Sequence, residues 1–118
     1  MTSREIGNIG EEYTEKYLVS KGCEILARNF CIKGGELDIV AKKGSLIHIV
    51  EVKTRKAGAL QSGDEAITGK KISRIIKAAS AFITANELDL SCVFDVAIIE
   101  MRGEEITGFK YIQRAFTA

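Results

Sequence analysis

Apolar residues recur along the chain at two different spacings, and these spacings predict where helices and strands lie. Near the N-terminus, apolar side chains follow one another at the intervals of one helix face: Ile6, Ile9, Tyr13 and Tyr17. Gly10 lies on the same stripe, where a glycine usually permits the close approach of another element. Thr2 and Glu5 form a capping box ahead of this stripe, and Gly22 stands where a helix commonly ends. The pattern predicts a helix from Ser3 to Lys21, with Glu11 near the flank of its apolar face and Glu12 and Glu15 toward solvent.

A second helix is predicted by a stronger apolar stripe: Ile72, Ile75, Ile76, Ala79, Phe82 and Ile83. Ser62 with Glu65 offers a capping box for its start, and Thr68 is an alternative start. The stripe ends near Asn86. The opposite side of this helix carries basic residues at helical spacing: Lys70, Arg74 and Lys77, with Lys71 adjacent.

Five shorter segments have the alternation or the apolar runs of strands. They are Cys23 to Phe30, Glu36 to Lys42, Leu46 to Thr54, Cys92 to Glu100 and Glu105 to Gln113. The first of them is predicted to be an outer strand. Short loops at Gly34-Gly35 and at Lys43 to Ser45 join the first three strands into hairpins. The order α-β-β-β-α-β-β predicts an α/β fold, a sheet of mixed direction flanked by helices.

Composition narrows the class of protein. A chain of 118 residues with 46% hydrophobic and 28% charged residues is typical of one globular domain, here 1–118. We expect a cytoplasmic protein with no membrane partner, because no apolar run approaches a membrane span and the N-terminus lacks a signal-peptide core. Three cysteines without CxxC spacing and a single histidine argue against a structural zinc site and for reduced thiols.

The charged residues are nearly balanced but unevenly placed. There are 17 Lys and Arg against 16 Asp and Glu, a formal charge of +1. The acids gather on the first helix and the hairpin, and the bases gather at Arg55, Lys56, Lys70, Lys71, Arg74 and Lys77. We expect these bases to form one basic rim that binds a nucleic-acid backbone. A solvated helix face is the commoner explanation of such a run before the fold is considered.

Candidate chemistry lies in the central hairpin. Glu36 and Asp38 share one face of their strand, Glu51 and Lys53 share one face of the next, and the loop brings Asp38 beside Glu51. Two neighbouring carboxylates repel unless a cation separates them, and Mg²⁺ takes one or two carboxylates, a carbonyl and waters. With Lys53 to position a water, these residues suit metal-assisted phosphodiester hydrolysis. By spacing alone, a solvated ion-pair face is at least as good an explanation, but acids inside apolar runs need a partner or a purpose.

Several short motifs in order resemble the YraN-like family of small bacterial proteins. They are Gly10-Glu11, Arg28-Asn29, Gly35-Glu36-Leu37-Asp38, Val50-Glu51-Val52-Lys53-Thr54-Arg55 and Phe94-Asp95-Val96, and the resemblance runs from Ile6 to Phe116. It implies a restriction-endonuclease-like fold, related to archaeal Holliday-junction resolvases and to PD-(D/E)xK nucleases. By that resemblance Asp38 and Glu51 are the metal-binding acids, Lys53 is the catalytic lysine, Glu11 completes the site from the first helix, and Glu36 supports it.

The resemblance implies a Mg²⁺- or Mn²⁺-dependent endonuclease acting on DNA, with branched or structured DNA as a candidate substrate. The Val52 carbonyl would assist Glu11, Asp38 and Glu51 in holding the metal, and resolvase-like relatives suggest a homodimer. The alternative is a catalytically silent module on the same fold that binds nucleic acid or a partner. The chain departs from the family pattern at His48, Val93 and Arg114. We predict a core or helix-facing position for His48 and place Asp95 outside the site, as a group that orients neighbouring backbone or a basic side chain.

Overall fold

Helices and strands follow one another in the predicted order in the computed structural model, which describes residues 1–58 and 67–118. The elements are α1 (Ser3–Ser20), β1 (Glu24–Ile32), β2 (Gly35–Lys43), β3 (Leu46–Lys56), α2 (Gly69–Ala85), β4 (Ser91–Arg102) and β5 (Glu105–Phe116). The order α-β-β-β-α-β-β and the α/β class are therefore confirmed, and the arrangement agrees with the predicted restriction-endonuclease-like class.

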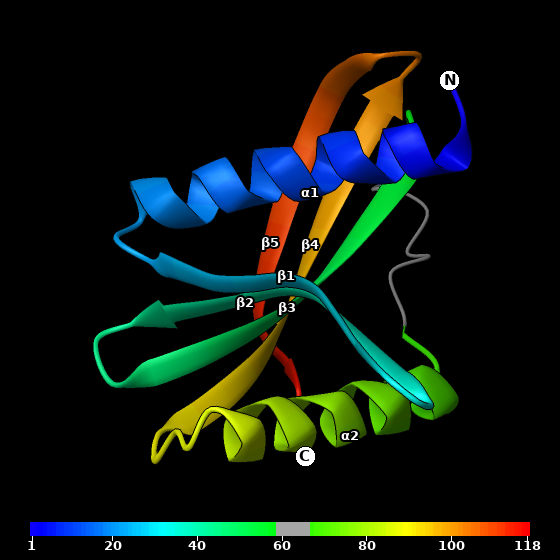
Figure 1. Ribbon diagram of the computed structural model, residues 1–118. Coiled ribbons are helices and arrows are strands. Elements are labelled where there is room, and N and C mark those ends of the chain that lie inside the picture. Colours follow the sequence, from blue (N-terminus) through cyan, green and yellow to red (C-terminus); the bar gives the residue numbers. More distant parts are fainter. Residues whose placement is uncertain (59–66) are drawn as a thin grey trace.

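The strands form one mixed sheet in the order β1-β2-β3-β4-β5, so β1 is an outer strand as predicted. β3 and β4 are parallel and are joined through α2, whereas the other neighbours are antiparallel. The two helices cover opposite faces of the sheet (Figure 1). Each helix closes a separate apolar core: Leu37, Ile49 and Phe94 pack with α2, and Ile39, Val50 and Ala97 pack with α1.

The first helix begins and ends on local signals. The Thr2 hydroxyl accepts a hydrogen bond from the Glu5 N–H, and the Glu5 carboxylate accepts one from the Thr2 N–H, both at 3.1 Å. The predicted capping box is thus confirmed, and the helix ends at Ser20, one residue before the predicted Lys21. The predicted apolar face is wrong in part, because Tyr13 is 40% exposed.

The buried residues of α1 are Gly10, Thr14 and Leu18. The predicted place of Gly10 on the buried face is therefore confirmed. A Cβ at Gly10 would lie 2.8 Å from the Thr54 Oγ1 of β3, closer than real Cβ contacts come. The missing side chain therefore lets the helix rest directly on β3. Because Gly10 touches the sheet, Thr14 and Leu18, which follow it at intervals of four residues, also face the sheet. Tyr13 lies at the edge of this buried face and is partly exposed.

The second helix starts at Gly69, and Thr68 is its N-cap, with the Thr68 hydroxyl accepting from the Lys71 N–H at 3.3 Å. Thr68 was the alternative of the two predicted starts; the other, at Ser62 and Glu65, lies outside the described residues. The helix ends at Ala85 and buries Ile75, Ala78, Ala79 and Phe82. A Cβ at Gly35 would lie 2.5 Å from the Arg74 carbonyl oxygen, so the start of β2 lies against the backbone of α2.

Most strands run further than the sequence pattern predicted. β3 reaches Lys56 rather than Thr54, β4 reaches Arg102 rather than Glu100, and β5 reaches Phe116 rather than Gln113. β3 and β4 support each other, since their parallel ladder continues to Lys56 opposite Met101. Hydrogen bonding to a neighbouring strand thus lengthens these strands into polar residues, where the hydrophobic pattern alone predicted no strand.

No helix among the described residues has the length and apolar character needed to cross a membrane. Cys23, Cys31 and Cys92 are all free thiols, as the cysteine spacing predicted.

Candidate functional site

The site lies where β2 and β3 part. Their ladder runs from Lys43 opposite Leu46 to Ile39 opposite Val50, and Asp38 would face Glu51 at the next step. There the Asp38 carboxylate accepts a hydrogen bond from the Val52 N–H at 2.8 Å, so a side chain takes the place of a ladder acceptor. Asp38 and Glu51 line the same cleft at this fork, so the predicted proximity of the two acids is confirmed.

The chain conformation at Asp38 explains why its side chain enters this fork. Leu37 packs in the α2-side core, whereas Ile39 packs in the α1-side core, although alternate strand residues normally share a face. The regular alternation of β2 is therefore interrupted at Asp38. On the paired strand β1, Asn29 has a φ of 52°, between the pairs Arg28–Ile39 and Phe30–Leu37. Both strands thus bend at the level of the acid.

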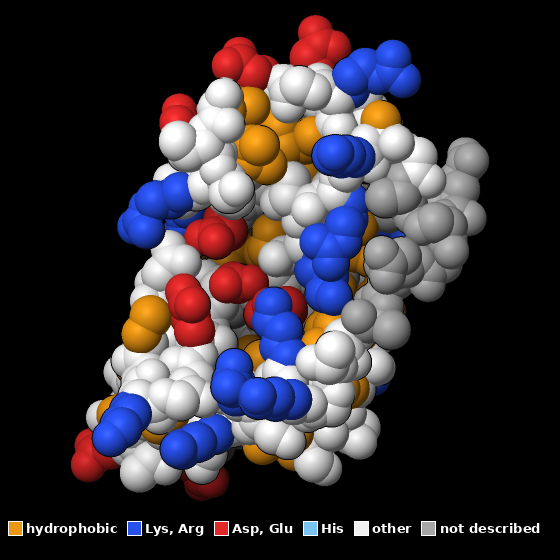
Figure 2. Space-filling view, turned by 90° about the vertical axis from the view of Figure 1, so that its right-hand side faces the viewer, with side chains coloured by type: hydrophobic (Ala, Val, Ile, Leu, Met, Phe, Trp, Pro, Cys, Tyr) orange, Lys and Arg blue, Asp and Glu red, His pale blue; other side chains and the backbone are white. Residues whose placement is uncertain are grey.

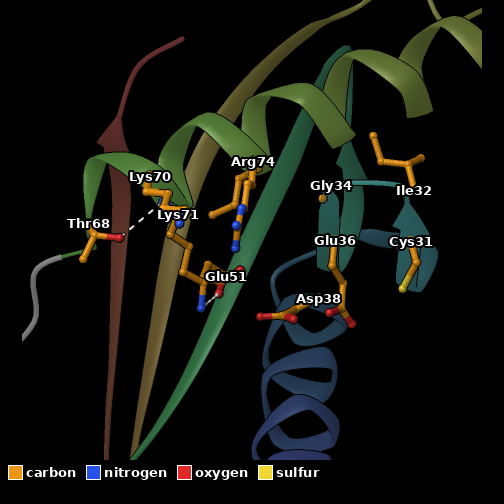
Figure 3. Close-up of a pocket in the computed structure, with 12 residues that line it drawn as sticks. Cys31, Ile32, Gly34, Glu36, Asp38, Glu51, Thr68, Lys70, Lys71 and Arg74 are labelled. Atoms are coloured by element: carbon orange, nitrogen blue, oxygen red, sulfur yellow. Dashed lines mark hydrogen bonds and ion pairs between the residues drawn. The ribbon is translucent and has the colours of Figure 1, made fainter.

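Glu51 is buried, with a side chain only 6% exposed, and its partner comes from the helix opposite. The Lys71 Nζ lies 2.6 Å from the Glu51 Oε1, although the lysine side chain as a whole is 52% exposed. Figure 3 shows Lys71 reaching from α2 to Glu51 on β3. The sequence pattern predicted nucleic-acid binding alone for Lys71, and the structure adds this ion pair.

The charge conflict expected in the hairpin is visible in the pKa of Asp38. Burial, followed by the negative charge of Glu51, raises the pKa of the Asp38 carboxyl to about 7, against the opposing effect of the Val52 N–H and the Lys71 ammonium. Because the two carboxylates repel each other, one of them keeps a proton near neutral pH, and a divalent cation could replace that proton and neutralise both charges.

Glu11 approaches this pair from α1 and is held by β1. Burial and the charge of Asp38 raise the pKa of Glu11, whereas Arg28 and Asn29 bind its carboxylate and lower it. The Arg28 guanidinium lies 3.4 Å from Glu11 and 3.2 Å from Glu15. Glu15 is thus paired and only partly exposed, so the prediction that it projects toward solvent is wrong in part. Sequence reasoning missed the role of Arg28, and the only signal was its place in the Arg28-Asn29 motif.

A metal site at the fork would rest on two carboxylates. Within residues 1–58 and 67–118, no three His, Cys, Asp or Glu side chains gather closely enough to form a ligand set. Asp38 and Glu51 suffice for Mg²⁺, which commonly uses one or two protein carboxylates and fills its remaining positions with carbonyl or water oxygens. The donor chemistry therefore fits this metal. Ligand roles for Glu11 and for the Val52 carbonyl stay predictions.

Lys53 follows Glu51 by two residues on β3 and is buried like it. The intervening Val52 packs toward α1, so Glu51 and Lys53 share the α2 side of the strand, as predicted. A buried lysine is uncommon and needs charged or polar partners. The position agrees with the catalytic role that the family resemblance implies, which itself stays a prediction.

A cleft of about 780 Å³ opens over the fork, between β2, β3 and the first turns of α2. Its sheet side carries Glu36, Asp38 and Glu51, and its helix side carries Lys70, Lys71 and Arg74 (Figure 3). Figure 2 shows the acidic side chains in the middle of one face with basic side chains beside and below them. The cleft thus joins a carboxylate centre to a positive wall.

The other three basic candidates are not among the residues that line the cleft. Arg55 and Lys56 line a second hollow of about 500 Å³ beside the start of α1. Lys77 lies farther along α2, and its ammonium is close to Gly34, since a Cβ added to that glycine would lie 3.3 Å from the Lys77 Nζ. That the six residues form one basic rim stays a prediction.

Asp95 belongs to a separate network on the α1 side of the sheet. Its fully buried carboxylate lies 2.7 Å from the His48 Nδ1, accepts from the Tyr111 hydroxyl at 2.5 Å and accepts from the Arg114 N–H at 2.9 Å. The last contact holds a bulge of β5, where Arg114 has a φ of 52°. His48 thus lies on the α1 side of the sheet, away from Glu51 and Lys53, as predicted. Of the two roles predicted for Asp95, the contact with the Arg114 N–H supports the orientation of backbone.

The fold and this cleft define a small α/β protein in which paired carboxylates in a mixed sheet face a basic helix. The chain belongs to the uncharacterised protein family UPF0102, whose family model matches residues 10–99. The resemblance to the YraN-like family is thereby confirmed.

Three similar proteins cover nearly the whole chain, and each is described as a UPF0102 protein. The one from Synechococcus sp. (strain JA-3-3Ab) is 42% identical over 93% of this chain and 88% of its own length. The protein from Hahella chejuensis is 37% identical over 98% of this chain and 92% of its own length. The protein from Dictyoglomus turgidum is 35% identical over 98% of this chain and 100% of its own length.

Proposed function

We propose that this protein is a metal-dependent nuclease that hydrolyses phosphodiester bonds in DNA. The observation that carries the proposal is the placement of Asp38 and Glu51 together at the β2–β3 fork, under the basic start of α2. Two carboxylates in an apolar sheet destabilise each other, and a divalent cation relieves that repulsion. A fold that retains such a pair beside an open cleft is suited to binding a metal there.

In this proposal the residues divide the work between metal, water and substrate. Asp38 and Glu51 would hold Mg²⁺ or Mn²⁺ with the Val52 carbonyl, Glu11 would move closer to complete the set once the metal is bound, and Glu36 would support the site. The metal would supply Lewis-acid activation of the phosphate and of a water. Lys53 positions the attacking water and stabilises negative charge on the phosphate. Lys70, Lys71 and Arg74 bind the phosphate backbone along the helix wall.

The proposal is tested by cleavage of labelled junction, flap, single-stranded and duplex DNA in Mg²⁺, in Mn²⁺ and in EDTA. Asp38→Ala and Lys53→Ala are each expected to lower the cleavage rate by at least about 100-fold, the scale of losing one charge-stabilising or proton-transfer group. Glu12→Ala is a matched control, because Glu12 is an exposed acid that pairs with Lys16 on the outer side of α1. Cleavage that persists in EDTA, or that is equal in all variants, contradicts the proposal.

A second candidate, a binding module without catalysis, is favoured by one observation. Glu51 and Glu11 already have protein partners, Lys71 and Arg28, so the acids are balanced by the chain itself. Such a module would bind DNA in fluorescence anisotropy without cleaving it in either metal. Its binding would survive Glu51→Ala and would be lost on replacing Lys70 and Arg74 together.

A further inference from the structure

We propose that Lys71 is a built-in counterion of the acidic site, which a divalent metal displaces so that the released ammonium joins Lys70 and Arg74 in binding phosphate. This inference rests on the proposed function, because it assumes that the site takes a metal. It assigns to Lys71 two alternating partners, a carboxylate and a phosphate.

The geometry of the ion pair is that of a long side chain reaching into a buried centre. The Lys71 Nζ lies 2.6 Å from the Glu51 Oε1, where the glutamate side chain is almost fully buried. About half of the lysine side chain remains exposed in the cleft. Its ammonium therefore lies beside the very carboxylate that the metal is expected to use.

The Lys71 ammonium is an incomplete partner for the two carboxylates. Lys71 contacts Glu51, whereas the neighbouring Asp38 carboxylate accepts a hydrogen bond from the backbone N–H of Val52. A divalent ion brings twice the charge and can be shared by both carboxylates. Electrostatics thus favours exchange of the lysine for the metal whenever the metal is present at sufficient concentration.

The exchange requires little rearrangement of the protein. Lys71 stands in the first turn of α2, and its exposed stem can swing within the cleft that Lys70 and Arg74 also line. A cation at a helix N-terminus is unfavourable on its own, and the first turn of α2 contains no acidic residue to offset it. A phosphate entering the cleft would replace Glu51 as the partner of the displaced ammonium. Metal and phosphate should therefore strengthen each other's binding, as linkage requires.

The test measures metal binding rather than cleavage. Mn²⁺ binding is followed by electron paramagnetic resonance for the unaltered protein, Lys71→Met and Lys70→Met, all in the full chain. Removal of the competing ammonium is expected to tighten Mn²⁺ binding of Lys71→Met about tenfold, the effect of one nearby charge in a partly screened cleft. Lys70→Met removes the same charge one residue away and is expected to change the dissociation constant by less than about twofold.

Thermal unfolding supplies a second readout. In EDTA, Lys71→Met is expected to melt at a lower temperature than Lys70→Met, because it leaves Glu51 without its ammonium partner. Added Mn²⁺ should then raise the melting temperature more in Lys71→Met than in either other protein, since the metal replaces the missing charge.

The phosphate half is tested with a short single-stranded oligonucleotide whose linkages are phosphorothioates, in Ca²⁺ and in EDTA. Ca²⁺ should tighten oligonucleotide binding of the unaltered protein severalfold, and Lys71→Met should lose most of that gain. If Ca²⁺ tightens oligonucleotide binding equally in both proteins, the proposal that the displaced Lys71 ammonium binds phosphate is overturned.

The outcomes separate this inference from the proposed function. If the unaltered protein binds Mn²⁺ and both lysine variants bind it alike, the counterion role is overturned while the metal-dependent function stands. If none of the three proteins binds Mn²⁺ at millimolar concentration, both the inference and the metal-dependent function are overturned.

Discussion

Asp38 is held between opposing influences at the scale of a single side chain. Burial and the charge of Glu51 oppose its ionised form, and the Val52 N–H and the Lys71 ammonium favour it. The sequence predicted the conflict, because a short hairpin loop sets Asp38 across from Glu51. It did not predict the backbone donor, which depends on β2 bending at that residue.

The raised pKa of Asp38 predicts how stability depends on pH in the absence of metal. The native state binds the proton more tightly than the unfolded chain, whose pKa is near 3.8, so stability is lost as pH rises from about 4 through the native pKa of about 7. Asp38→Asn removes this loss and keeps an acceptor for the Val52 N–H. Above pH 7 in EDTA it should be more stable than the unaltered protein by on the order of 2 kcal/mol.

Urea unfolding between pH 4 and pH 8 measures this difference, and the two proteins should converge near the acid end of the range. Mg²⁺ should stabilise the unaltered protein at pH 8 and have less effect on Asp38→Asn. A difference that stays constant across the pH range would show that Asp38 does not titrate between the two states as described.

At the scale of the elements, local signals determined the helices better than the strands. The capping box at Thr2 and the N-cap at Thr68 are encoded within a few residues, so both helix starts were accessible to sequence reasoning. Strand ends depend on the neighbouring strand, which explains why β3, β4 and β5 extend past their predicted limits. The buried face of α1 also depended on its neighbour, since contact with β3 selects Gly10 as its centre.

The close contact of α1 with β3 predicts opposite effects of alanine at two glycines of the same helix. Gly10→Ala places a methyl group 2.8 Å from Thr54 Oγ1 and should destabilise the protein by about 1–3 kcal/mol through overpacking. Gly7→Ala meets nothing within 4 Å and should stabilise it by up to about 1 kcal/mol through helix propensity. Chemical denaturation of both variants is the measurement, and equal effects would contradict the packing described for α1.

For the whole molecule, the two faces of the sheet carry different tasks. The cleft with its acids lies on the α2 side, whereas Asp95, His48 and Tyr111 form a network on the α1 side, where Tyr111 also packs on Tyr17. Asp95 occurs in the same family motifs as the site acids, and sequence alone placed it outside the site. The structure shows what it does there: it fixes the end of β5.

This separation predicts that Tyr111→Phe lowers stability without affecting the cleft. The variant loses a hydrogen bond to the buried Asp95 carboxylate, so its free energy of unfolding in urea should be lower by about 1–2 kcal/mol. DNA cleavage and Mn²⁺ affinity at a temperature where the protein stays folded should remain as in the unaltered protein. Tyr13→Phe, at an exposed tyrosine of α1, is the matched control and should change stability little. A loss of Mn²⁺ affinity in Tyr111→Phe would mean that the two faces are coupled.

The sequence by itself determined the order of elements, the helix caps, the hairpin that sets Asp38 against Glu51, and the family, because periodicity, caps and short loops act over a few residues. Only the tertiary structure decided the ion partners. Lys71 reaches Glu51, and Arg28 reaches Glu11, because α2 and β1 pack against the sheet at particular distances and angles. No local rule gives those distances, and for that reason the sequence did not predict that Lys71, one of the basic residues of α2, pairs with Glu51.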